Sequence, residues 1–72
     1  MNIENLLRNE EEIKKEIQSI SSKHPFVARC LLLMLEDCKE DRFEFEGFKE
    51  YCRGIPYPGI KVKNKILNLL KV

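Results

Sequence analysis

Apolar residues in the first part of the chain recur with helical spacing. Leu6, Ile13 and Ile20 are seven residues apart, and Ile17 lies on the adjoining seam. This spacing collects the apolar side chains on one side of a helix. The pattern therefore predicts an amphipathic helix over residues 3–20.

The apolar run Phe26–Leu35 follows a proline. Pro25 suits the first position of a helix, because a backbone N–H at that position would have no partner in any case. Only Arg29 interrupts the apolar run, so a helix over residues 25–38 would be apolar nearly all round. A helix without a polar face is surrounded by other elements. We therefore expect residues 25–38 to form a buried central helix.

The next segment has signals for the start and the end of a helix. Asp41 and Glu44 have the spacing of a capping box, in which each side chain pairs with a backbone N–H at the helix start. Gly54 can end the helix in the left-handed conformation. These signals predict a third helix over residues 43–53.

Residues 55–59 contain two prolines and a glycine and cannot continue a helix. An amphipathic basic helix is expected after this linker, over residues 62–71. Alternating apolar and polar residues also leave a short strand near 42–46 or 60–63 as an alternative. The sequence thus predicts one all-α domain over residues 1–72, a compact bundle of about four short helices around the central apolar helix.

Composition narrows the class of protein further. The chain is 43% hydrophobic and 35% charged, which is typical of a folded protein. Charged residues interrupt every apolar run before the length that a membrane span needs. The start of the chain lacks the basic and apolar parts of a signal peptide, and three cysteines are an odd number for a disulfide framework. We therefore expect a cytoplasmic protein with reduced thiols and no membrane partner.

The sequence lacks the residue patterns that a metal site or a catalytic site needs. His24, Cys30, Cys38 and Cys52 are not spaced as the close pairs that close a zinc site. No glycine-rich phosphate loop is present, and so short a chain has little room to exclude water from a reaction. We expect a binding protein, not an enzyme, with no catalytic residues, no metal, no cofactor and no small-molecule substrate.

The segment Phe43–Tyr51 resembles the second half of a calcium-binding EF-hand. In the best register, Gly47 stands where the bidentate glutamate belongs and Asp41 stands where glycine is needed. We therefore interpret its phenylalanines as core or interface anchors.

The charge distribution singles out the C-terminal segment. From Ile55 onward there are four lysines and no acidic residue, which leaves a net charge of −3 on the preceding residues of a chain whose total is +1. Lysines contact phosphates and asparagines can contact base edges, so this segment predicts DNA binding in a helix-turn-helix-like arrangement. The alternative is that the lysines are only the solvated face of a helix. The candidate nucleic-acid-binding residues are Lys61, Lys63, Asn64, Lys65, Asn68 and Lys71.

A second hypothesis is a protein–protein interaction module, such as an adaptor, a subunit or a small inhibitor. A domain of this size hides only about 60% of its unfolded surface, so self-association as a homodimer would add burial. The apolar stripe of the first helix can serve this purpose, or it can pack on the central helix within one chain. A tyrosine between two prolines is a further interface anchor. The candidate interface residues are Leu6, Ile13, Ile17, Ile20 and Tyr57.

Overall fold

The computed structural model describes residues 3–56 and 59–71, and this part of the chain forms five helices without a strand. The all-α prediction is therefore confirmed, and the helix expected over 62–71 begins two residues earlier. The helices are α1 (Ile3–Arg8), α2 (Glu10–Ser19), α3 (Pro25–Lys39), α4 (Phe45–Arg53) and α5 (Ile60–Leu69).

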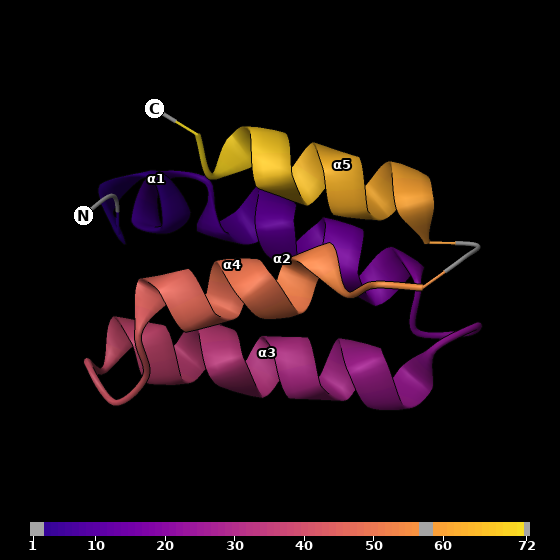
Figure 1. Cartoon of the computed structure of the whole chain (residues 1–72), viewed down its shortest axis with the longest axis horizontal. Coiled ribbons are helices and arrows are strands. Elements are labelled where there is room, and N and C mark those ends of the chain that lie inside the picture. The colour runs from indigo at the N-terminus through magenta and orange to yellow at the C-terminus, as the bar shows by residue number, and fades with distance from the viewer. Residues whose placement is uncertain (1–2, 57–58, 72) are drawn as a thin grey trace.

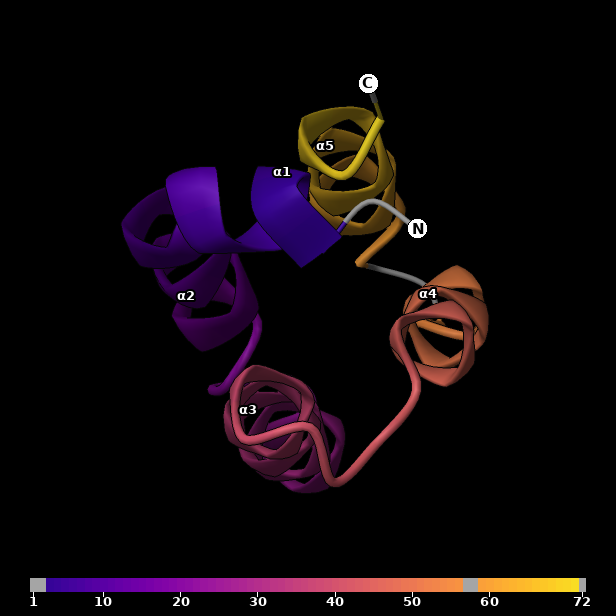
Figure 2. The same cartoon turned by 90° about the vertical axis from the view of Figure 1, so that its left-hand side faces the viewer.

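Helices α2 to α5 form an up-and-down bundle in which successive helices run in opposite directions (Figure 1). Seen from one end, they make a ring in which each helix packs against two neighbours, in the order α2, α3, α4, α5 and back to α2 (Figure 2). Helix α3 therefore lies diagonally opposite α5. Helix α1 crosses the end of the bundle at which α5 finishes.

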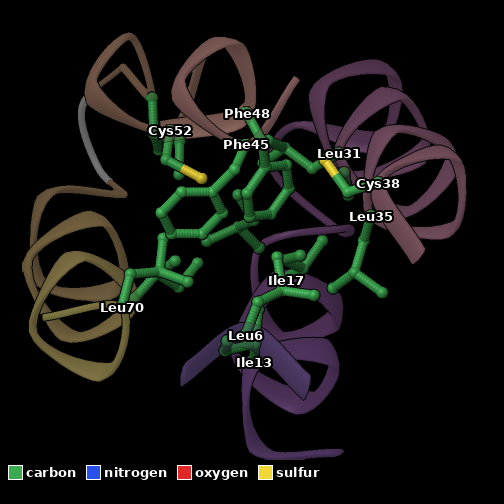
Figure 3. Close-up of a cluster of buried hydrophobic side chains, with 14 residues drawn as sticks. Leu6, Ile13, Ile17, Leu31, Leu35, Cys38, Phe45, Phe48, Cys52 and Leu70 are labelled. Atoms are coloured by element: carbon green, nitrogen blue, oxygen red, sulfur yellow. The ribbon is translucent and has the colours of Figure 1, made fainter. Parts of the chain in front are cut away.

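The core lies in the middle of the ring, and every helix contributes to it (Figure 3). Phe45 and Phe48 of α4 are its largest buried side chains. Their rings lie in the middle of the cluster, and α2 and α3 supply aliphatic residues spaced three and four apart. The buried apolar residues are Leu6, Ile13, Ile17, Ile20, Ala28, Leu31, Leu35, Cys38, Phe45, Phe48, Cys52, Ile55, Ile66 and Leu70.

The expectation of a central helix was wrong. In a ring of four helices none is central, because side chains occupy the middle, and α3 packs chiefly against α2 and α4. Helix α3 buries Ala28, Leu31 and Leu35 but leaves its other side open. Phe26 is 79% exposed and Leu33 is 59% exposed. The prediction that Pro25 is the first residue of this helix is confirmed.

The single helix expected over residues 3–20 is divided at Asn9. The backbone hydrogen bonds from Asn9 N to Asn5 O (3.1 Å) and from Ile13 N to Asn9 O (2.9 Å) carry the chain through the bend. The side-chain amide of Asn9 donates a hydrogen bond to the Leu69 carbonyl at 3.0 Å. Asparagine favours such local departures because its amide finds partners other than the helix backbone.

The prediction of a capping box that starts at Asp41 was also wrong. Asp41 has φ of 60° and follows the end of α3, where its N–H donates to the Cys38 carbonyl at 3.2 Å. The next N–H, that of Arg42, reaches back to the Asp37 carbonyl at 2.8 Å. These two bonds define a Schellman motif with aspartate at the position that glycine usually takes. Asp41 therefore ends one helix and does not begin the next, which starts after Glu44.

The two ends of the linker are tightly packed. Gly54 follows α4 with φ of −86°, so the left-handed end expected there is absent. Ile55 is buried, and Gly59 lies so close to it that an added Cβ would stand 2.7 Å from Ile55 Cγ2. This packing returns the chain directly into α5 beside α2.

Candidate nucleic-acid interface

Helix α5 separates its apolar and polar residues cleanly. Ile66 and Leu70 are buried and hold the helix on the bundle. The residues on the opposite side are exposed, so the structure brings most of the predicted C-terminal candidates to one surface. These exposed residues are Lys61, Asn64, Asn68 and Lys71.

The other two predicted lysines lie elsewhere on the helix. Lys65 Nζ lies 3.0 Å from Glu16 Oε2 of α2, and this hydrogen bond is the main reason that the pKa of Lys65 is raised. Lys63 is partly buried. Because Glu16 neutralises Lys65, the side of α5 that faces the glutamate-rich α2 is unsuited to phosphate.

Helix α4 supplies two cations that the sequence analysis missed. Lys49 and Arg53 are four residues apart and therefore lie on the same side of α4. With α5 they line a shallow groove, and its lining contains basic, amide and leucine side chains but no acidic ones. The groove is lined by Lys49, Arg53, Asn64, Leu67, Asn68, Leu70 and Lys71. The spacing of Lys49 and Arg53 is visible in the sequence, but Glu46 and Glu50 stand beside them and cancel the charge of the segment.

Those glutamates pair with the α4 cations. Glu46 lies 3.7 Å from Lys49, and Glu50 lies 2.7 Å from Arg53. Exposed pairs three residues apart on a helix are worth little, so a phosphate can compete with these glutamates. Within residues 3–56 and 59–71, no carboxylate lies within ion-pair distance of Lys61 or Lys71.

The relation of α4 to α5 differs from that of a helix-turn-helix unit. In such a unit two helices cross at roughly 90–120° around a short turn, and the second one stands out to enter a groove. Here α4 and α5 lie side by side and run in opposite directions (Figures 1 and 2). Helix α5 therefore presents a side of the bundle and does not project from it.

The apolar stripe of α1 and α2 is part of the core. Leu6, Ile13 and Ile17 have no exposed surface, and Ile20 is 5% exposed. The interface predicted at these residues is therefore corrected, and the intrachain alternative is the one that the bundle adopts. An amphipathic pattern looks the same whether a helix packs on its own chain or on another. Tyr57 lies outside the described residues.

The thiols are poorly suited to reactivity. Burial is the main cause that raises the pKa of Cys52 to about 12, and it also raises the pKa of Cys38. Thiolates are the reactive form, so these cysteines behave as apolar side chains. No cluster of three metal-ligating side chains is present in the part of the chain that the structure describes. No helix in that part is long and apolar enough to cross a membrane.

Comparison with known proteins gives no relative: no family model, curated protein or solved structure matches the chain. The function is therefore argued from its surfaces.

Proposed function

We propose that the protein binds nucleic acid through a basic face formed by α4 and α5. This basic face consists of Lys49, Arg53, Lys61 and Lys71 around Asn64 and Asn68. The observation that supports the proposal is that cations from two helices surround one groove whose lining has no acidic side chain. Phosphate contacts supply most of the affinity of nonspecific nucleic-acid binding.

The bundle favours contact along the phosphate backbone. Helix α5 packs between α2 and α4, and Lys61 and Lys71 are exposed on its outer side. Asn64 and Asn68 lie between those lysines and can donate to phosphate oxygens or to base edges. The glutamates of α2 repel phosphate on one side, which orients the backbone toward the α4 side of the groove.

The proposal is tested by fluorescence anisotropy with a labelled DNA duplex and a labelled single strand at several salt concentrations. Four phosphate contacts predict a log–log salt slope of about −3.6 on a duplex, at about −0.9 per contact. Changing Lys61 and Lys71 together to glutamate should lower the magnitude of that slope by about 2 and weaken binding at low salt.

The matched control changes Arg8 and Lys15 to glutamate. Both residues are exposed and lie outside the basic face, and the change in net charge is the same. If the basic face is the binding site, this control keeps far more affinity than the Lys61/Lys71 variant. Equal loss in the two variants, or no binding by the wild type at low salt, would refute the proposal. Lys65 is left unchanged because a glutamate there would face Glu16.

A protein–protein interaction module is the second candidate function. The observation that favours it is the open apolar side of α3, where Phe26 is 79% exposed and Leu33 is 59% exposed. Large apolar side chains that gather on one exposed surface often mark an interface. An adaptor, subunit or small inhibitor would use this side of the bundle in place of the buried stripe of α1 and α2.

A further inference from the structure

The open side of α3 forms a continuous apolar strip. Phe26, Cys30 and Leu33 recur at helical spacing, and we call these three residues the α3 outer face. Phe26 and Leu33 are the two most exposed large apolar residues in the described part of the chain. Tyr51 of the neighbouring helix α4 is also exposed, at 38%. Helix α3 lies at the lower edge of the bundle in Figure 1, with no helix beyond it.

The charges beside the α3 outer face change sign along the helix. Lys23 and Arg29 lie near its start and are exposed. Glu36 and Asp37 lie near its end, where Glu40 also follows. Both acidic side chains have ion-pair partners within the chain but stay accessible. Asp37 is paired with Arg42 at 3.5 Å and its side chain is 48% exposed. Glu36 is paired with Lys14 at 3.3 Å and with Lys39 at 3.7 Å, and its side chain is 47% exposed.

We propose that the α3 outer face binds a second copy of this chain in antiparallel orientation. An antiparallel pair centred on Leu33 sets the basic start of each helix beside the acidic end of the other. Arg29 of one copy then meets Glu36 and Asp37 of its partner, and the same contact recurs across the two-fold axis. A parallel pair would instead set like charges side by side. The surface is therefore complementary to itself in one orientation.

The charge pattern also distinguishes this occupant from nucleic acid. The acidic end of α3 repels phosphate. A second copy in antiparallel orientation instead sets an opposite charge beside both the basic and the acidic end of the helix. Burying Leu33 at the centre of the pair removes a large exposed apolar side chain of a domain that is small enough to gain from added burial. The inference deepens the second candidate function by naming the partner, and it does not depend on nucleic-acid binding.

Sedimentation equilibrium without nucleic acid tests the proposal over a wide concentration range. The wild type should be a monomer–dimer mixture, and Leu33→Glu should weaken dimerisation roughly 30-fold or more, as expected for a central interface residue. The matched control is Leu7→Glu, because Leu7 is a similarly exposed leucine on α1, at 49%. Far-UV circular dichroism and a thermal melt check that both variants fold.

Charge reversal tests the antiparallel orientation. Arg29→Asp and Asp37→Arg should each weaken the dimer about tenfold, because each sets like charges against each other across the two-fold axis. The double variant should recover most of that loss. A parallel dimer would not recover in this way.

Three results would overturn the proposal: a wild type that stays monomeric to about 1 mM, equal effects of Leu33→Glu and Leu7→Glu, or no recovery in the double variant. A monomer would mean that another partner, or none, covers the α3 outer face. Loss of DNA binding in the Lys61/Lys71 variant is measured separately, so failure of the nucleic-acid proposal is distinguishable from failure of this one.

Discussion

Replacing Asn5 with alanine removes the side chain that ties the first helix to the last turn of the bundle. Asn5 Nδ2 donates to the Leu70 carbonyl at 3.3 Å and also to the Lys71 carbonyl. Asn5 is only 8% exposed and Leu70 only 2% exposed, so water has little access to the vacated Leu70 carbonyl. We therefore expect Asn5→Ala to destabilise the fold.

Two opposing effects set the magnitude. A buried polar group that loses its partner costs about 1–3 kcal/mol. Alanine forms helices better than asparagine, which returns about 0.5 kcal/mol within α1. The expected net loss is about 1–2 kcal/mol. Asn5→Asp should lose more at neutral pH, because its carboxylate cannot donate and faces carbonyl oxygens.

Urea denaturation followed by circular dichroism measures this loss. With a slope of about 1 kcal/mol per molar urea for a small domain, the midpoint should fall by about 1–2 M. Asn68→Ala is the matched control, because Asn68 is an exposed asparagine on α5 and its loss should be neutral or slightly stabilising. If Asn5→Ala behaves like Asn68→Ala, the bond from Asn5 to the end of α5 does not stabilise the bundle and the reasoning is wrong.

Three further changes test local features by the same denaturation measurement. Gly59→Ala should destabilise, because its Cβ would meet Ile55 Cγ2 at 2.7 Å, whereas Gly54→Ala has its nearest contact at 3.4 Å and should be tolerated or stabilising. Asp41→Gly should stabilise by about 0.5–1 kcal/mol, because glycine adopts the left-handed conformation without strain. Hydrogen bonds from Lys39, chiefly, and from Lys14 lower the pKa of Glu10 below its ordinary value of 4.5. The stability that Glu10 adds is therefore present above that pH and lost as the pH falls below it. The difference between wild type and Glu10→Gln should accordingly shrink on acidification, and a constant difference would contradict this assignment.

The sequence alone predicted the structure correctly where the structure depends on residues that are close together in the chain. Pro25 and the leucine-rich run predicted α3 within one residue of its observed end. The amphipathic helix predicted over residues 62–71 likewise corresponds to α5, which buries Ile66. In each case residues three and four apart decide the outcome, and the rest of the fold does not change it.

The errors arose where the outcome depends on residues distant in the sequence. Helix propensity and apolar content cannot say how many neighbours α3 has, and in a ring of four it packs chiefly against two. The sequence also gave no sign that the bundle brings Glu16 within 3.0 Å of Lys65. Asp41 fits both a helix start and a Schellman turn, and the backbone selects the turn.

The two proposed surfaces lie on diagonal helices, and this geometry has a consequence for their combination. A two-fold dimer through the α3 outer face would direct its two α5 helices away from each other. Helix-turn-helix dimers bind one duplex because both recognition helices face the same side of it. This dimer could not do so, and each basic face would bind its own duplex. Sedimentation of the complex should therefore find two short duplexes per dimer. A stoichiometry of one duplex per dimer would mean that at least one of the two surfaces is misassigned.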